Sequence, residues 1–310
     1  MKSINISKKA FDKLEELKLP NEVLSSESKL YIYNFRGQQK LVKKLYKTNG
    51  EYFATKLYTV AMLDECKENL PDNFVIPDYT LSIGHENVGF TVPKVNGITL
   101  SSLLIDMKRD PREQVDYLKQ IGGTIRQLES IRRYTGLKSI FLNDINESNF
   151  VVTPNNRELY VIDLDSVKIE SNKIFPARYL SKRGLLSNVP EKYIRNEKAW
   201  TTQEEDEYDT KYRFAEGFYI PDANTDLYCY CIIILNYLYG GNINNMSLVE
   251  FYEYLNYLEH IGLNKELLEC LRNIVNTRDN YNPADYLDTL TTENIVRAKQ
   301  KIFNLNRSKN

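Results

Sequence analysis

The chain has 310 residues, which is long enough to bury one large core or two smaller cores that share a cleft. Its 41 Lys and Arg residues nearly balance its 42 Asp and Glu residues, so the composition gives no reason to expect nucleic acid as a partner. Four scattered cysteines and two histidines are too few to indicate a disulfide framework or a zinc site.

Residues 1–25 are expected to form a short helical extension in front of the main fold. Phe11, Leu14 and Leu17 recur at three-residue spacing among Lys and Glu, and Pro20 would end the helix. The segment lacks the apolar core of a signal peptide, and no apolar run in the chain approaches the roughly 18 residues that a membrane span needs. These patterns predict a cytoplasmic protein that makes no contact with a membrane.

Residues 26–95 have the pattern of a small β-rich unit. Three β-prone runs lie at 30–33, 41–46 and 52–58. Turn residues separate them, at Gly37 and then at Asn49 and Gly50, and Asn-Gly between two such runs is a strong hairpin signal. The pattern predicts a meander of three strands with Lys56 on the third strand.

Four further elements are expected in the rest of this unit and just beyond it. A short helix is predicted over 59–70. Two more strands are predicted around 80–83 and 88–92. The stretch 93–97, with a proline at one end and a glycine at the other, then reads as a connector to the remainder of the chain.

Beyond Gly97 the period of the apolar positions changes from two to about 3.6, which is typical of helices. Asp110 is a good N-cap for a long helix whose apolar stripe ends near Gly136. A second helix is predicted with Asp226 as its N-cap and Gly240 at its C-terminal end. It is apolar on all sides and is therefore expected to be buried centrally. Residues 291–310 read as a charged helical tail.

The most informative stretch lies at 141–167. A polar loop carries Asp144 and Asn149, and two short apolar runs on either side of a turn then lead to Asp163. Such runs predict a hairpin. The hairpin would return Asp163 to the side of Asn149, so that three oxygen-bearing side chains meet. Mg²⁺ prefers oxygen ligands and takes one or two of them from protein.

This order of features resembles the catalytic loop and metal-binding segment of protein kinases. In both, an aspartate is followed five residues later by an asparagine, then by a hairpin and a further aspartate. The resemblance extends in the same order over about 30–290, where Lys56 and Asp226 stand for the family's strand lysine and helix aspartate. It implies an α+β, two-lobed protein kinase-like fold. The small antiparallel β lobe would span 26–95, and the larger, mostly α-helical lobe 96–290.

The resemblance also implies roles for single residues. Asp144 would be the catalytic base, and Lys56 would hold the phosphates of ATP. Asn149 and Asp163 would bind Mg²⁺. Glu65 would pair with Lys56 and keep its side chain extended.

Three further assignments complete this expected site. Glu68 is the alternative to Glu65 as the partner of the lysine. Gly37 would belong to the loop that covers the phosphates. Val95 would donate its N–H to the adenine edge, because Pro93 lacks an N–H.

The chain departs from the kinase pattern at several positions. Leu142 and Asn143 replace the usual His-Arg before the catalytic aspartate, and Asn146 stands where a lysine is usual. The triplet that starts at Asp163 is Asp-Leu-Asp instead of Asp-Phe-Gly, and the expected phosphate loop has one glycine where the family has three. A Val-Pro-Glu sequence at 189–191 resembles the Ala-Pro-Glu sequence that closes the activation segment of kinases.

The resemblance therefore implies an ATP- and Mg²⁺-dependent phosphotransferase that acts on a hydroxyl group. The acceptor, a protein or a small molecule, is not readable from the sequence. Because of the departures, a pseudokinase that binds nucleotide or a partner without turnover stays an alternative. Transfer of a nucleotide instead of a phosphoryl group, and an α+β interaction domain without nucleotide, are also open.

Overall fold

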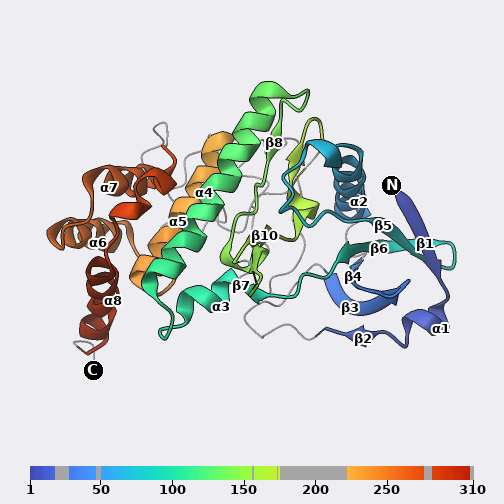
Figure 1. Cartoon of the computed structure of the whole chain (residues 1–310), viewed down its shortest axis with the longest axis horizontal. Helices are drawn as coiled ribbons and strands as arrows, with labels where there is room; N and C mark the ends of the chain where they lie inside the picture. Colours follow the sequence, from blue (N-terminus) through green and yellow to red (C-terminus); the bar gives the residue numbers. More distant parts are fainter. Residues whose placement is uncertain are drawn as a thin grey trace.

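A computed structural model of the chain describes residues 1–17, 28–46, 50–155, 157–172, 174, 222–275 and 281–307. Over these residues the protein is an α+β structure, in which a six-stranded sheet near the N-terminus is followed by a mostly helical region. Figure 1 shows the sheet at one end of the molecule and the C-terminal helices at the other. The α+β class predicted from the sequence is confirmed. Within these ranges no helix has the length and apolar character needed to cross a membrane.

The part of the chain that builds the sheet contains short strands and two α-helices. In chain order these elements are β1 (Lys2–Ile6), α1 (Lys8–Phe11), β2 (Glu15–Glu16), β3 (Ser28–Phe35), β4 (Gln38–Leu45), α2 (Gly50–Glu65), the 3₁₀ turn η2 (Lys67–Asn69), β5 (Tyr79–Ile83) and β6 (Glu86–Pro93). The helical region that follows also carries short strands. Its elements are β7 (Ile98–Thr99), α3 (Leu100–Ile105), α4 (Pro111–Tyr134), β8 (Ile140–Phe141), η3 (Glu147–Asn149), β9 (Phe150–Val152), β10 (Leu159–Val161), η4 (Leu164–Ser166), β11 (Lys168–Ile169), α5 (Ala223–Tyr239), α6 (Leu248–His260), α7 (Lys265–Arg272) and α8 (Thr292–Arg307).

The six strands of the main sheet lie in the order β1-β5-β6-β4-β3-β2. β1 runs parallel to β5, whereas the other neighbours pair antiparallel. The sheet is mixed, so the prediction of an antiparallel sheet is wrong at β1, a strand that the sequence pattern did not indicate. The helix predicted for residues 1–25 is therefore wrong over most of its described part. Lys2–Ile6 is a strand because Ile4 and Ile6 alternate with exposed residues and both face the core, and the helix is limited to Lys8–Phe11.

Each face of this sheet packs against a different helix. On one face, Val42 of β4 packs in a cluster with Phe11 of α1. On the other face, Leu45 packs in a cluster with Val60 of α2. Since side chains alternate along a strand, Lys43 lies on the same face as Leu45 and on the side of α2.

The third strand of the predicted meander is in fact a helix. Residues 52–58, with Lys56 among them, lie inside α2. Phe53, Leu57 and Val60 recur at helical spacing and pack together against the sheet. Burial of this stripe outweighs the β-preference of the aromatic and Thr residues and the hairpin signal before them, because intrinsic propensities are weak.

Helices α4 and α5 form the centre of the helical region. As predicted, Asp110 caps α4, and its Oδ1 accepts a bond of 2.9 Å from the N–H of Arg112. α5 is buried nearly throughout and ends at Gly240, whose φ of 72° is the left-handed conformation that favours glycine. The hydroxyl of Tyr230 in α5 donates to the carbonyl oxygen of Leu118 in α4 at 2.6 Å.

The last helix, α8, adds Ile295 and Ala298 to the same core. The helix predicted in the C-terminal tail is thus confirmed over Thr292–Arg307. The Val-Pro-Glu sequence at 189–191 lies outside the described residues.

Asp226 anchors the loop that precedes β9 to the buried helix α5. The N-cap of α5 is Asp222, not Asp226 as predicted, because the Asp222 side chain forms a capping box with Thr225. The two carboxylate oxygens of Asp226 instead accept bonds from the backbone N–H groups of Leu142 and Asn143, at 3.0 and 2.8 Å. Burial raises the pKa of Asp226 to about 6, in spite of these two bonds.

We predict that Asp226→Ala lowers the thermal stability of the protein more than Asp222→Ala does. The first change leaves buried N–H groups without acceptors, at a cost of about 1–3 kcal/mol each. The second removes a helix cap worth about 0.5–2 kcal/mol. Thermal melts followed by far-UV circular dichroism compare the two variants with the unchanged protein. A melting temperature that does not move in Asp226→Ala would contradict the anchoring role.

Candidate active site

The loop between β8 and β9 brings Asp144 and Asn149 into contact. The Asn149 side-chain N–H₂ donates to the backbone carbonyl oxygen of Asp144 at 2.9 Å and to its carboxylate at 3.0 Å. Asn143, just before Asp144, has a left-handed φ of 64°, which costs energy outside glycine but is tolerated by asparagine. Its N–H is one of the two groups that Asp226 binds. The Asp226 carboxylate therefore helps to stabilise this bend, which sets where Asp144 points.

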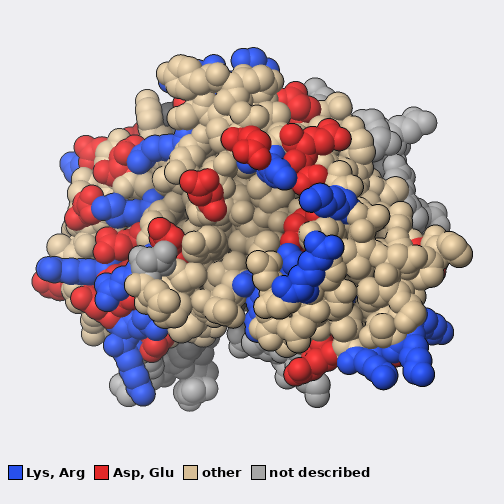
Figure 2. Space-filling model, turned by 45° about the vertical axis from the view of Figure 1, so that its right-hand side comes forward, with Lys and Arg blue, Asp and Glu red and all other residues tan. Residues whose placement is uncertain are grey.

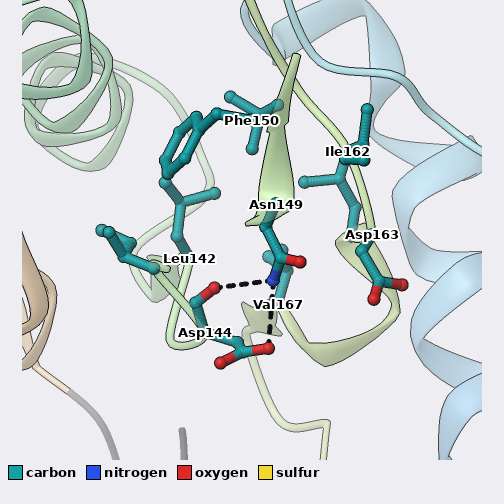
Figure 3. A pocket seen from close by; sticks show the side chains of 10 residues that line it. Leu142, Asp144, Asn149, Phe150, Ile162, Asp163 and Val167 are labelled. Atoms are coloured by element: carbon teal, nitrogen blue, oxygen red, sulfur yellow. Dashed lines mark hydrogen bonds between the residues drawn. The ribbon is translucent and has the colours of Figure 1, made fainter. Parts of the chain in front are cut away.

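The β9–β10 hairpin returns the chain to this loop, as the sequence predicts. Val161 lies opposite Phe150, and the N–H of Ile162 donates to the carbonyl oxygen of Asn149 at 2.9 Å. Asp163 follows directly, and in Figure 3 Asn149 lies between the carboxylates of Asp144 and Asp163. The three predicted oxygen-bearing side chains are thus brought to one place.

Asp163 itself has a left-handed backbone, with φ 61° and ψ 46°. This conformation turns the chain sharply from the strand into η4. Non-glycine residues held in such conformations occur often at functional sites, where the surrounding structure compensates for the strain. Two of them, Asn143 and Asp163, flank this site.

The residues around Asp144, Asn149 and Asp163 line a hollow of about 10 Å³ (Figure 3). A space of this size holds about one water molecule. The hollow can therefore hold one water molecule that hydrates an ion, or a single ligand atom. A nucleotide is far larger than this hollow and would have to lie outside it.

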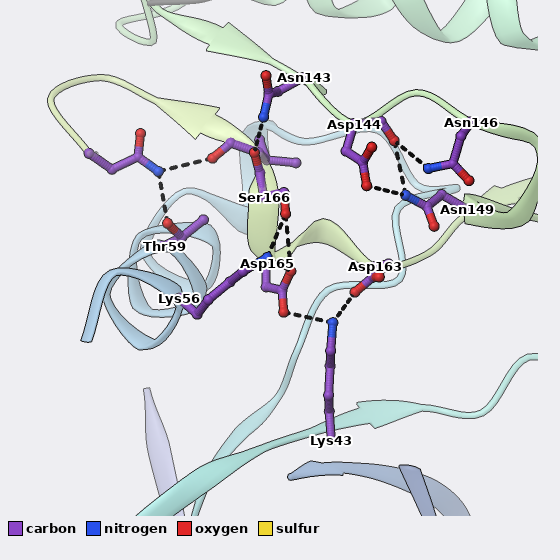
Figure 4. Close-up of polar contacts among 12 residues, drawn as sticks. Lys43, Lys56, Thr59, Asn143, Asp144, Asn146, Asn149, Asp163, Asp165 and Ser166 are labelled. Atoms are coloured by element: carbon purple, nitrogen blue, oxygen red, sulfur yellow. Dashed lines mark hydrogen bonds and ion pairs between the residues drawn. The ribbon is translucent and has the colours of Figure 1, made fainter. Parts of the chain in front are cut away.

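Lys43 of β4 is the strand lysine that reaches this site. Its ammonium group forms an ion pair with Asp163 and lies 2.8 Å from Oδ2 of Asp165. Figure 4 shows the side chain extending from the sheet toward both carboxylates. The prediction that Lys56 is the strand lysine is wrong, because Lys56 belongs to α2.

Lys56 reaches the same cluster from another direction. Its ammonium group lies 2.7 Å from Oδ1 of Asp165 and donates to the hydroxyl of Ser166 at 2.6 Å. The side chains of Lys56 and Asp165 are 3% and 1% exposed, so this ion pair is shielded from water. Asp165 is therefore held between two lysines that come from a strand and from a helix.

The charges of this cluster shift the pKa of its two carboxyl groups. Burial by itself would raise the pKa of Asp165, but the ammonium groups of Lys43 and Lys56 outweigh it and lower the pKa to about 2. Desolvation and the negative charge of Asp165 raise the pKa of Asp163, against the attraction of Lys43. Since the Asp163 side chain is 41% exposed, solvent screens this second shift, and Asp165 is the firmly ionised member of the pair.

The predicted partner of Lys56 is wrong as well. Glu65 is exposed and lies nine residues after Lys56 in the same helix. With a rise of about 1.5 Å per residue, the two residues are about 13 Å apart along the axis. Glu68, the alternative, is exposed in η2 beyond the end of α2. Neither glutamate can replace Asp165 as the partner of this lysine.

Gly37 lies away from the carboxylates. Gly37 is in the two-residue turn between β3 and β4, with φ 79°. It stands six residues before Lys43 in an extended strand, which corresponds to about 20 Å. This turn therefore does not cover phosphates bound at Lys43. Val95 lies, half-buried, in the connector between β6 and β7, and its contact with the adenine edge stays a prediction.

Sequence reasoning missed Lys43, Asp165 and Ser166. Leu41, Lys43 and Leu45 alternate along the predicted second strand, and a lysine on an otherwise apolar face was the available signal. Asp165 follows Asp163 after a single apolar residue. That spacing in the sequence did not indicate which aspartate would be buried.

A metal ion at this site would have few protein ligands. The Asp163 carboxylate and the side-chain oxygen of Asn149, which lies on the side of Asp163 in Figure 3, are two groups that could bind it. Across the described ranges, no cluster of three or more His, Cys, Asp or Glu is placed to hold a metal. Mg²⁺ commonly binds with one or two protein groups and completes its shell with phosphate and water. The pair fits that kind of metal binding and not an all-protein metal cage.

No protein-family model matches the chain, and no curated protein matches it either. The functional interpretation therefore depends on the geometry of the site itself.

We predict that Asp165→Asn destabilises the protein far more than Asp163→Asn. The first change leaves two buried ammonium groups around a neutral amide, and breaking a buried ion pair from one side costs about 3–5 kcal/mol. Asp163 is partly exposed, so water compensates for its loss. Urea unfolding at pH 7 measures both variants, and equal losses would contradict the assignment of Asp165 as the central charge.

The same experiment at lower pH adds a second test. The pKa of Asp165 is about 2 in the folded protein and about 3.9 in an unfolded chain, so the folded state binds the proton less tightly. Its stabilising contribution is present above about pH 4 and is lost as the pH falls toward 2. The gap between the unchanged protein and Asp165→Asn should shrink over this range.

Proposed function

We propose that this protein is an ATP- and Mg²⁺-dependent phosphotransferase with a two-lobed, protein kinase-like architecture. The single observation that carries the proposal is the convergence of a strand of the sheet with the loop and the hairpin end of the helical region. A lysine on β4, the loop with Asp144 and Asn149, and Asp163 after β10 meet in one cluster. Phosphoryl transfer requires a cation for the phosphates, oxygen ligands for a metal, and a group beside the acceptor.

The arrangement of elements supports this proposal. A small sheet provides the lysine, the connector with Val95 follows its last strand, and a helical region provides the loop and the carboxylates. Asp226, at the start of a buried helix, holds the backbone of the loop. Each of these features stands in the order that the kinase resemblance implies.

In this proposal Lys43 binds the α- and β-phosphates of ATP, in place of the previously expected Lys56. Asp163 and Asn149 hold Mg²⁺, which neutralises charge on the phosphate oxygens. Asp144 aligns the acceptor hydroxyl and accepts its proton as the hydroxyl oxygen attacks the γ-phosphorus. The bond between the γ-phosphorus and the bridging oxygen of ADP breaks, and ADP leaves.

The acceptor carries a hydroxyl group, on a protein or on a small molecule. On the face shown in Figure 2, acidic and basic side chains are interspersed.

A pseudokinase without turnover is the second candidate, and one observation favours it. Lys43 is bound to the proposed metal ligand Asp163, and the hollow beside that ligand is about 10 Å³. Nucleotide and metal would have to separate this ion pair before they bind. A protein in which the pair persists would act by binding a partner.

Nucleotide binding should depend on Lys43 and on divalent metal. We expect Lys43→Met to weaken binding of Mg-ATP about tenfold or more, because it removes the charge-assisted bonds to phosphate. Asp163→Ala should abolish the difference in ATP affinity with and without Mg²⁺. Calorimetry with ATP, in Mg²⁺ or in a chelator, measures both effects.

Lys29→Met, on an exposed lysine paired with Glu16 on β2, is the matched control and should bind ATP as the unchanged protein does. Equal affinities in all four proteins would exclude this site.

Asp144 should matter for turnover and little for binding. Asp144→Asn keeps a side-chain oxygen for the bond from Asn149, so ATP affinity should stay within a few-fold. Transfer should fall by about 10²–10⁴, the range for loss of a general base. The assay follows radiolabel from the γ-phosphate of ATP into protein, small molecules and free phosphate. Glu147→Gln is the control, since Glu147 lies on the same loop but bonds to Asn236 of α5. Full transfer by Asp144→Asn would overturn its role.

A further inference from the structure

Helix α2 contributes a positive charge at a place where the kinase pattern expects a carboxylate. We infer that Lys56 is a positioning residue, which fixes Asp165 so that Asp165 in turn holds Lys43 ready for the phosphates of a nucleotide. This inference rests on the proposed function. In it, a positively charged residue of the helix supports the phosphate-binding lysine, where the kinase pattern has a negatively charged one.

The geometry of Asp165 carries the first step. Its two oxygens are divided between the two lysines, with Lys56 2.7 Å from Oδ1 and Lys43 2.8 Å from Oδ2. A carboxylate bound on both oxygens cannot rotate without losing one partner. The position of the Lys43 ammonium group is therefore linked, through Asp165, to that of Lys56.

The second step is that α2 is fixed by more than one contact to the segment that contains Asp165, Ser166 and Asn172. Thr59, three residues after Lys56, lies on the same side of the helix. Its hydroxyl accepts a bond of 2.9 Å from the side-chain N–H₂ of Asn172, just beyond β11. Ser166 accepts from Lys56 at 2.6 Å. Lys56 is thus placed by the helix and by the segment it contacts, and its buried charge keeps it on Asp165.

The third step concerns the metal ligand. Lys43 contacts both Asp163 and Asp165. When Asp163 turns to bind a metal ion, Lys43 loses one partner but keeps the other. Asp165 prevents a buried ammonium group from being left without a carboxylate, and the lysine remains extended beside the phosphates. A glutamate on α2 is then not needed to support it.

The experiment compares Lys56→Met with Lys56→Arg, and uses Lys67→Met as the matched control. Lys67 follows α2, is about half exposed and pairs with Asp64 at 3.7 Å, away from the cluster. Binding of ATP, ADP and adenosine is measured by calorimetry in Mg²⁺ for every protein. Adenosine carries no phosphate and so does not report on Lys43.

We expect Lys56→Met to weaken the binding of ATP and ADP about tenfold, because the loss is confined to phosphate contacts. The affinity for adenosine should stay within about twofold. Lys56→Arg keeps the cation and should bind ATP nearly as well as the unchanged protein. Lys67→Met should behave as the unchanged protein. If Lys56 acted only in folding, Lys56→Met would bind adenosine as well as ATP more weakly.

Two outcomes overturn the inference alone. One is an ATP affinity that Lys56→Met leaves unchanged while Lys43→Met lowers it. The other is an equal loss of ATP and adenosine. If Lys56→Met does not fold, Lys56→Gln replaces it, since an amide keeps a donor for Asp165 and Ser166 but carries no charge, and the same selective loss is expected. If the unchanged protein binds neither ATP nor ADP, the proposed function itself fails, and the inference fails with it.

Discussion

The structure around the site depends on one buried carboxylate, Asp165, that lies between two ammonium groups. A lone charge at this depth would be strongly unfavourable, and so would either lysine without it. Lys43 comes from the sheet and Lys56 from the helix that covers the sheet, while Asp165 follows the hairpin of the helical region. The sheet and the helical region are therefore joined by charge at the point where Asp144, Asn149 and Asp163 also meet.

The site residues that sequence reasoning placed correctly are those fixed by local geometry. Asp144, Asn149 and Asp163 lie within one short stretch, and the turn between two β-prone runs determines that the chain doubles back. Their approach therefore follows from the spacing alone. Lys43 and Asp163 are 120 residues apart, and no local pattern specifies that contact. It depends on how the sheet packs on the hairpin, which a single sequence does not reveal.

The error at Lys56 has a definite physical origin. Asn49 and Gly50 favour a hairpin, and aromatic and β-branched residues follow them, so a strand was the natural prediction. The stripe formed by Phe53, Leu57 and Val60 nevertheless has helical spacing and buries itself on the sheet. Burial of an amphipathic face contributes more than local propensity does. Because residues 52–58 belong to a helix, the lysine that reaches the site from a strand is Lys43 of β4.

Charge reversal on α2 changes what this helix can contribute to the site. A glutamate on the helix would bind the phosphate-contacting lysine directly and would release it if the helix moved. Here the helix carries Lys56, and its effect reaches Lys43 through Asp165, which belongs to the same short segment as Asp163, the proposed metal ligand. A shift of α2 would therefore disturb both the lysine and the turn that holds Asp163 in its left-handed conformation. In the proposed function, phosphate binding by Lys43 and metal binding by Asp163 would both depend on the position of α2, because the Asp165 carboxylate contacts Lys43 and Lys56 and lies two residues after Asp163.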